Sequence, residues 1–396
     1  MPFPTWMPLL LGLLSAVGPL STDMYLPAFP AIEASFGGAA GTAQITLATW
    51  FAGLAVGQLT QGTLADRYGR RGPLIVGTAL YTLATIGCAV APDLTTLSVM
   101  RGLSAFGGSA SMVISRAVVR DLADGHAAAR LMSRLILVMG AAPILAPTLG
   151  GVVLAAAGWQ AIFWICAAYG ALCCGCVAAF LPETLPEQRR VKLGPGAQLT
   201  RYAAILGERG FLTHALLGGF AMFGMFAFLA GSPPVFIEHF RLSPAAYGGL
   251  FGCCAAGFIL SSQISPRLLP LVGADRLIRV AVRCFLCATL ALTVIAFAQW
   301  KGWMGPYWLA VALPVAVSMA SQGFTMPNAT VGALSRHAAH AGSASALMGT
   351  LQFGLASSSG LIVGLASDGT ARPMALLMLA GASGAAICDL YRPRKQ

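Results

Sequence analysis

The sequence predicts an all-α membrane protein with twelve transmembrane helices, arranged as two pseudo-symmetric six-helix bundles. Hydrophobic residues make up 57% of the 396 residues and charged residues only 9%, and the mean hydropathy is +0.77. A water-soluble core could not bury this much apolar surface. The apolar residues also form repeated runs of the length, about 20 residues, that a helix needs to cross a hydrocarbon core of about 30 Å.

Twelve such runs follow one another along the chain, and short polar turns separate most of them. The expected spans are 9–29, 43–64, 73–91, 94–119, 131–157, 159–181, 211–236, 244–271, 277–299, 302–326, 342–367 and 373–390.

The longest break in hydropathy, 182–210, contains five basic residues, several acids and an expected turn at the PGA sequence around Pro195. It divides the chain into an amino-terminal six-helix bundle (1–181), a cytoplasmic linker (182–210) and a carboxy-terminal six-helix bundle (211–396). An even number of spans gives both halves the same topology. An axis along the membrane normal can then relate them, with a binding site at their interface.

The basic residues are distributed unevenly among the predicted loops. If the N-terminus is cytoplasmic, the even-numbered loops, the span ends next to them and the tail hold 20 of the 24 Lys and Arg residues. The positive-inside rule therefore places both termini in the cytoplasm. This distribution explains the net charge of +11 by contact with a lipid bilayer, so no nucleic-acid partner is expected.

Several patterns that carry chemistry are missing from the sequence. Cys173–Cys176 and Cys284–Cys287 have CxxC spacing, but they lie in apolar spans without a second chelating pair. There is no HExxH sequence and no GxxxxGK[ST] phosphate loop. The spans also lack the clustered nucleophile and base of a membrane enzyme. We therefore expect no metal, no enzymatic activity and no cofactor.

The first span is not expected to be a removable signal peptide.

Six sequence motifs carry a resemblance to a known family. GTLADRYGRR (62–71) lies between the second and third spans, LSVMRGLSAFGG contains Arg101, and APTLGG (146–151) lies in the fifth span. With these, the chain resembles the major facilitator superfamily over essentially its whole length. STDMYLP (21–27), SRAVVRDL (115–122) and SASALMGTLQF (343–353) are similar to its Bcr/CflA branch, named for bicyclomycin and chloramphenicol resistance. That branch exports drugs in exchange for protons. The chain departs from the family's motifs at Ser104 and Ala146.

Asp23 and Arg101 are the candidate proton-coupling pair. The helical rise of 1.5 Å per residue places both at similar depth in the outer half of the membrane. A charge buried there costs about 2.5 to 3.5 kcal/mol on insertion scales, so each should face a wet cavity or the other. We expect Asp23 to carry the proton and Arg101 to be its electrostatic partner. The alternative is a static ion pair, or a carboxylate that caps the break at 25–27.

Asp66, Gly69 and Arg70 are the candidate inner gate. Gly69 permits a tight turn, and the Asp66 carboxylate can pair with the N-terminal amides of a neighbouring helix or with an arginine. Such a latch would hold the cytoplasmic side shut and favour the outward-open state. The alternative is that Arg67, Arg70 and Arg71 only set the topology.

The fifth span contains Gly140, Pro143, Pro147, Gly150 and Gly151. Pro147, Gly150 and Gly151 belong to the sequence that resembles the antiporter motif. Proline removes a backbone hydrogen bond and glycine allows close helix approach, which suits a bending or sliding contact. Gly and Pro are also ordinary in membrane helices.

Aromatic, Met and amide side chains near the middle of the spans are candidate cargo contacts, since adaptable apolar side chains suit a pocket for many shapes. Most aromatic residues in a membrane protein serve packing instead. The candidates are Tyr25, Trp50, Phe51, Phe106, Met112, Met222, Phe226, Tyr247, Asn328, Gln352 and Phe353.

The expected function is proton-coupled multidrug efflux by alternating access in a bacterial inner membrane. The expected cargo is a small amphipathic drug, the coupling ion is the proton, and the protein is expected to act as a monomer. The alternative is a proton-coupled exporter or importer of one endogenous metabolite, such as a sugar or an amino acid.

Overall fold

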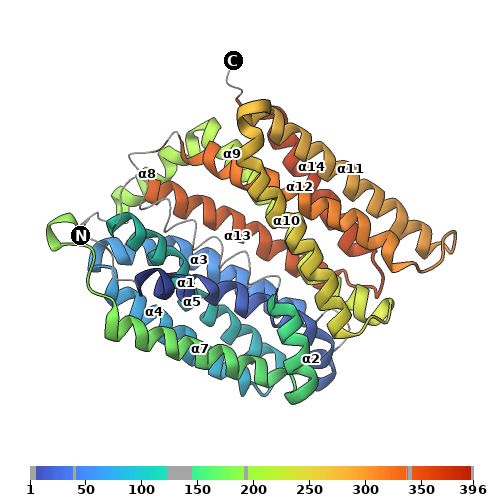
Figure 1. Cartoon of the computed structure of the whole chain (residues 1–396), viewed down its shortest axis with the longest axis horizontal. Helices are drawn as coiled ribbons and strands as arrows, with labels where there is room; N and C mark the ends of the chain where they lie inside the picture. The colour runs from blue at the N-terminus through green and yellow to red at the C-terminus, as the bar shows by residue number, and fades with distance from the viewer. Residues whose placement is uncertain are drawn as a thin grey trace. The chain divides into compact units, whose positions relative to one another are not determined.

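A computed structural model describes residues 6–38, 42–122, 145–190, 195–335, 337 and 341–393. All the secondary structure in these ranges is helical, which confirms the predicted all-α class (Figure 1).

The first half of the chain begins with α1 (Met7–Asp23), a 3-10 turn η1 (Leu26–Ala28) and the short helix α2 (Phe29–Ser35). The break after Asp23 precedes Pro27, a residue type that disfavours helical backbone in its predecessor. The longer helices that follow are α3 (Gln44–Tyr68), α4 (Arg71–Ala89), α5 (Leu94–Leu122), an unlabelled helix Leu145–Ala157 and α7 (Trp159–Phe180).

The second half begins after a 3-10 turn, η2 (Glu187–Arg189), and a helix, α8 (Pro195–Gly207). Its long helices are α9 (Arg209–Pro233), followed by the π-helical turn η3 (Pro234–His239), then α10 (Pro244–Val272), α11 (Ala274–Trp300), α12 (Trp308–Leu334), α13 (Ala341–Leu365) and α14 (Arg372–Tyr391).

Ten helices in the described part of the chain are long and apolar enough to cross a membrane. Helix α3, which has 25 residues but carries Gln58, Gln61, Asp66 and Arg67, is not among them. With α3 and Leu145–Ala157, these helices occupy all twelve predicted spans. The start of the fifth span, including Gly140 and Pro143, lies outside the described residues.

Two local predictions were wrong. The tenth span was expected at 302–326, but α12 covers Trp308–Leu334. The helix starts later because Gly302, with a positive φ of 74°, belongs to the preceding turn. It ends later because Pro327 lies inside the helix without ending it. The expected turn around Pro195 is instead the start of α8. Proline is well suited to a first helical turn, where its missing N–H would have no intrahelical partner.

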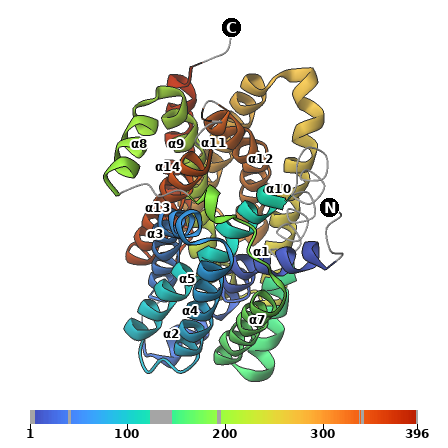
Figure 2. The ribbon, with the colours of Figure 1, turned by 90° about the vertical axis from the view of Figure 1, so that its left-hand side faces the viewer.

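The chain forms two compact units: Met1–Ala28 with Thr49–Gln198, and Phe29–Ala48 with Leu199–Gln396. We call them the amino-terminal and carboxy-terminal units. In the first, α1 and α4, the first and third spans, each pack against α5 and α7 (Figure 2). In the second, α9 and α11, again the first and third spans of that half, each pack against α12 and α14. The halves therefore repeat one packing pattern, as expected if their topology is the same.

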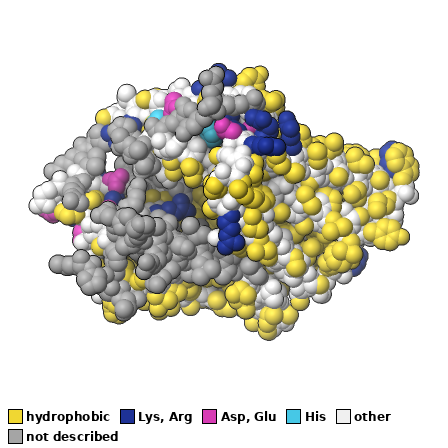
Figure 3. Space-filling view, turned by 45° about the horizontal axis from the view of Figure 1, so that its top comes forward, with side chains coloured by type: hydrophobic (Ala, Val, Ile, Leu, Met, Phe, Trp, Pro, Cys, Tyr) yellow, Lys and Arg dark blue, Asp and Glu magenta, His cyan; other side chains and the backbone are white. Residues whose placement is uncertain are grey.

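Apolar side chains also cover much of the outside of the helices. Leu83 of α4, Leu290 and Val294 of α11, and Leu313 of α12 are more than half exposed. Figure 3 shows one face on which hydrophobic side chains dominate the described surface and Lys and Arg gather in a few places. Such a surface is stable against lipid tails but not against water.

Candidate functional site

Arg101 lies at the centre of a buried cluster in the amino-terminal unit. Its side chain comes from α5, and the residue is 2% exposed. One guanidinium nitrogen, Nη1, donates a hydrogen bond of 3.1 Å to the carbonyl oxygen of Ser21 in the last turn of α1. The last four carbonyls of a helix have no intrahelical donor, and a cation is favoured at that end of the helix dipole. Arg101 thus caps α1.

Three aromatic rings surround the same guanidinium. Its central carbon is 4.3 Å from the ring centroid of Trp50, 4.6 Å from that of Tyr25 and 5.7 Å from that of Phe163. Aromatic faces attract a cation electrostatically, and more strongly when water is excluded. The rings therefore stabilise a positive charge that would otherwise be costly to bury.

Asp23 lies two residues after the carbonyl that Arg101 contacts, and it is 5% exposed. No ion pair joins it to Arg101, and no hydrogen bond to its carboxyl group is found among the described residues. Ser21, by contrast, shares a 2.5 Å hydrogen bond with the Tyr81 hydroxyl of α4. Residues two apart on a helix project about 200° from each other, so Ser21 and Asp23 face different sides of α1.

A second polar cluster lies where α3 turns into α4. Arg70 is buried and joins two carboxylates: Nη1 lies 2.5 Å from Asp66 Oδ1, and Nε lies 2.8 Å from Asp121 Oδ2 at the end of α5. Thr184 donates a 3.3 Å hydrogen bond to the same Asp121 oxygen. The predicted partner of Asp66 is thus Arg70 of the same loop, and the pair belongs to a network inside the amino-terminal unit.

Glu183, just after α7, completes this network. Its carboxylate accepts hydrogen bonds from the backbone N–H groups of Arg70 (2.8 Å), Leu185 (3.0 Å) and Arg71 (3.3 Å). Gly69 has a φ of 95°, and a Cβ atom there would lie 2.7 Å from Glu183 Cδ. Partial burial raises the pKa of Glu183, but the three backbone donors outweigh it and the pKa is lowered from its ordinary value of 4.5.

The sequence alone indicated neither Glu183 nor the role of Asp121. Asp121 stands within the quoted motif SRAVVRDL, and Glu183 is the first acidic residue after the sixth span. The three arginines of the loop 62–71 were a signal that acidic partners should lie near that loop. The sequence offered no basis for choosing among the several acids in 182–210.

The described glycines and proline of the fifth span form a buried stripe. Pro147, Gly150 and Gly151 are all buried on the helix Leu145–Ala157, at the i, i+3, i+4 spacing that shares one helix face. A Cβ atom on Gly150 would lie 2.7 Å from the carbonyl carbon of Met24. This helix therefore contacts the chain directly after Asp23.

The candidate cargo residues are divided between the units. Tyr25, Trp50, Phe51, Phe106 and Met112 lie in the amino-terminal unit, and Met222, Phe226, Tyr247, Asn328, Gln352 and Phe353 in the carboxy-terminal unit. Tyr25 and Trp50 contact Arg101. Asn328 and Tyr247 are used in packing: Asn328 donates to Ser265 Oγ at 2.8 Å, and the Tyr247 hydroxyl bonds Ser232 Oγ at 2.8 Å.

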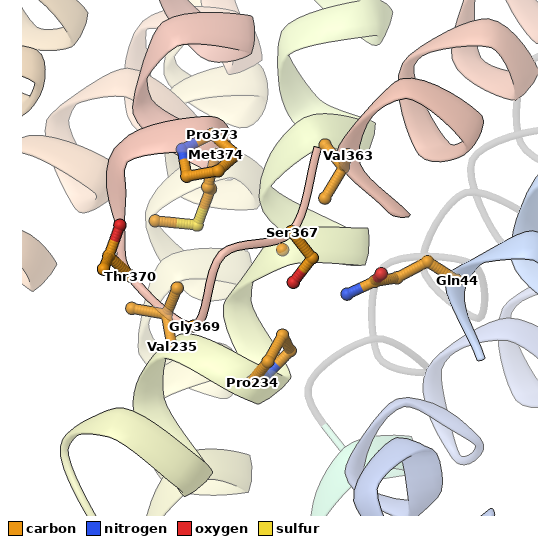
Figure 4. A pocket seen from close by; sticks show the side chains of 10 residues that line it. Gln44, Pro234, Val235, Val363, Ser367, Gly369, Thr370, Pro373 and Met374 are labelled. Atoms are coloured by element: carbon orange, nitrogen blue, oxygen red, sulfur yellow. The ribbon is translucent and has the colours of Figure 1, made fainter. Parts of the chain in front are cut away.

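A small pocket lies within the carboxy-terminal unit, near the ends of α9 and α13 (Figure 4). Gln44 and Ser367 point toward its space, and none of the candidate cargo residues lines it. Its lining residues are Gln44, Gly231, Pro234, Val235, Val363, Ser367, Gly369, Thr370, Pro373 and Met374.

The carboxy-terminal unit has its own buried arginine network, which the sequence alone did not predict. Arg392, after α14, pairs with Asp275 at the start of α11 and with Asp389 of α14, the latter at 2.8 Å. Like Arg70 in the other half, it links the start of the third span of its half to the end of a neighbouring helix. Here the arginine comes from the end of the sixth span.

Curated proteins of bacterial origin resemble the chain over most of its length. It is 34% identical over 371 residues to "Uncharacterized MFS-type transporter YdgK" of Bacillus subtilis, covering 93% of this chain and 90% of that protein. It is 27% identical over 370 residues to "Bicyclomycin resistance protein homolog" of Haemophilus influenzae, covering 93% and 92%. It is 30% identical over 326 residues to "Chloramphenicol resistance protein" of Pseudomonas aeruginosa, covering 80% and 75%.

Solved structures share the fold at low sequence identity. The crystal structure of a D-xylose-proton symporter superposes with a TM-score of 0.72 at 15% identity, covering 98% of this chain and 97% of that one. A bacterial homologue of the human lysosomal transporter Spinster gives a TM-score of 0.73 at 15% identity, covering 99% and 96%.

The profile of the Major Facilitator Superfamily matches residues 11–361. This match agrees with the repeated helix packing and with the relatives named for bicyclomycin and chloramphenicol resistance. The chain therefore belongs to the Major Facilitator Superfamily and is a multi-pass membrane transporter.

Proposed function

We propose that this transporter exports small amphipathic drugs in exchange for protons, by alternating access in a bacterial inner membrane with both termini in the cytoplasm. The observation that carries the proposal is the Asp23 carboxyl group, which is buried and has neither an ion pair nor a hydrogen bond among the described residues. The resistance proteins among the relatives supply the expected class of cargo.

The surroundings of Asp23 suit a group that takes up and releases a proton. A charged carboxylate without a partner is costly where water is excluded, and much less so where water reaches it. Arg101, the expected electrostatic partner, is held on the Ser21 carbonyl beside Asp23 rather than on its carboxylate. A small rotation of the end of α1 would change both the wetting of Asp23 and its distance from Arg101. Opening to one side or the other would therefore change its protonation.

The Asp66–Arg70–Asp121–Glu183 network is the proposed support of the inner gate. It fixes the α3–α4 turn against the ends of α5 and α7. This turn can then move as one body with the amino-terminal unit when the transporter switches. Asp66, whose side chain is 47% exposed, remains available to a further contact.

Export or import of a single metabolite is the second candidate function. The fold is shared with a D-xylose-proton symporter, and a carboxyl group such as Asp23 would serve a symporter as well as an antiporter. This function predicts saturable transport of one polar compound. Drug export predicts resistance to several unrelated compounds.

The test is a drug-susceptibility panel in an efflux-deficient bacterial host that expresses wild type or Asp23→Asn, with and without a proton uncoupler. We expect wild type to raise the inhibitory concentration of several unrelated compounds, and Asp23→Asn or the uncoupler to remove the effect. Asn keeps the size of the side chain but cannot exchange a proton.

The matched control is Asp93→Asn. Asp93 lies in the turn before α5, where its carboxylate accepts a 2.7 Å hydrogen bond from Thr96 N, and Asn caps a helix about as well as Asp does. This variant should behave as wild type. Full resistance in Asp23→Asn, with normal sensitivity to the uncoupler, would contradict the coupling role.

A further inference from the structure

The unused edge of the Arg101 guanidinium has the geometry of an anion-binding group. Nη1 is occupied by the Ser21 carbonyl, whereas Nε and Nη2 are buried and have no hydrogen-bond partner among the residues that the structure describes. These two nitrogens point their N–H groups in the same direction along one side of the guanidinium plane. That side forms two parallel hydrogen bonds to a carboxylate or to a similar oxyanion.

A third buried donor belongs to the same cluster. Trp50 Nε1 also has no hydrogen-bond partner in the described part of the chain, and its ring centroid lies 4.3 Å from the guanidinium carbon. Trp50 is 1% and Arg101 2% exposed. A buried donor without an acceptor costs about 1 to 3 kcal/mol, and more for a charged group. An acceptor that reaches this cluster would remove several such penalties at once.

Asp23, the acid expected to pair with Arg101, does not supply that acceptor. Asp23 lies on a different side of α1 from Ser21, which is bonded to Tyr81 in the Arg101 cluster. Tyr81 brings a hydroxyl group, and Tyr25, Trp50 and Phe163 bring aromatic faces. The cluster therefore joins an unmatched positive charge to apolar, planar surfaces.

We propose that Arg101 Nε and Nη2, together with Trp50 Nε1, form a subsite for the carboxylate of an aromatic or amphipathic acid carried by this transporter. This inference rests on the proposed export function and defines a substrate class for it. The carboxylate pairs with the fork of Arg101, and the apolar part of the substrate packs on the neighbouring rings. Because the donors are buried in this structure, the acid reaches them in a more open state of the transport cycle.

The test compares acids with their amides, which have nearly the same shape but no charge. Three scaffolds are used: naphthoate, cinnamate and ibuprofen, each against its amide. Binding to the purified protein in lipid nanodiscs is measured by equilibrium dialysis of the radiolabelled compounds, with empty nanodiscs subtracted. We expect the wild type to bind each acid at least about tenfold more tightly than its amide, given the strength of a bidentate charged pair.

Two variants separate the donors. Arg101→Lys keeps the charge but loses the fork, and should reduce the preference for acids by about tenfold. Trp50→Phe keeps an aromatic face but loses the N–H donor, and should reduce it by about threefold, the effect of one hydrogen bond. Arg67→Lys, at an exposed arginine of α3, is the matched control and should keep the wild-type preference.

The outcomes are separable from those of the proposed export function. Binding is measured at equilibrium without a proton gradient, so loss of coupling in Asp23→Asn does not affect it. Absence of any preference for acids in the wild type would overturn the subsite even if drug export is confirmed. An unchanged preference for acids in both single variants, Trp50→Phe and Arg101→Lys, would also overturn the subsite. If Arg101→Lys does not survive purification, the wild-type and Trp50→Phe results decide.

Discussion

Gly69 and Glu183 are expected to be energetically coupled, although they lie more than a hundred residues apart. Replacing Gly69 by Ala has two costs. The positive φ of 95° costs an L-residue about 1 kcal/mol. The new Cβ also enters the space of the Glu183 carboxylate, since it would lie 2.7 Å from Cδ. The carboxylate must then leave the backbone amides of Arg70, Arg71 and Leu185.

The size of the second cost follows from the three hydrogen bonds. Because Glu183 is partly solvated, we take them together as about 2 kcal/mol. Gly69→Ala should therefore cost about 3 kcal/mol. Glu183→Ala should cost about 2 kcal/mol, because it loses only the hydrogen bonds. In the double variant the hydrogen bonds are lost once and the space is free, so the total should be about 3 rather than 5 kcal/mol.

The assay is a double-mutant cycle on the purified protein, with unfolding by SDS in mixed detergent micelles. A coupling energy of about 2 kcal/mol is expected, with the double variant close to Gly69→Ala alone. Additive costs, within about 0.5 kcal/mol, would show that the two residues do not compete for the same space and would refute the reasoning.

Two further predictions concern the amino-terminal unit. Gly150→Ala should lower the stability by about 1 to 3 kcal/mol and should also lower drug export, because its Cβ would press on the Met24 backbone next to Asp23. The control is Gly175→Ala in α7, where a Cβ meets nothing within 4 Å, and it should leave stability and export unchanged. Equal effects of the two substitutions would contradict the close contact at Gly150. Glu183→Gln should be less stable than wild type at neutral pH, and the difference should shrink as the pH falls below 4.5. A carboxyl whose pKa is lowered by folding stabilises the protein above its unfolded-state pKa and loses that effect as it is protonated. SDS unfolding between about pH 7 and pH 3 measures this difference, and a gap that stays constant to the lowest pH would argue against it.

The sequence alone was sufficient for the fold class and for the approximate positions of most of the spans that the structure describes. Both depend on hydropathy and length, which are local properties: a segment of about 20 apolar residues must be helical in a bilayer, whatever its neighbours are. It was less successful at the end of α12 and at the start of α8. At those points the outcome depends on whether a single proline continues, begins or ends a helix.

The sequence also identified Asp23, Arg101, Asp66 and Arg70, because charges are rare in apolar spans and dense in one loop. It could not identify the other groups that these residues contact. Only the tertiary structure placed Arg101 on the Ser21 carbonyl among three rings, joined Arg70 to Asp121, and brought Glu183 to the amides after Gly69. Hydropathy fixes how deep a residue lies in the membrane, but the rotation and packing of each helix decide which neighbour its side chain meets.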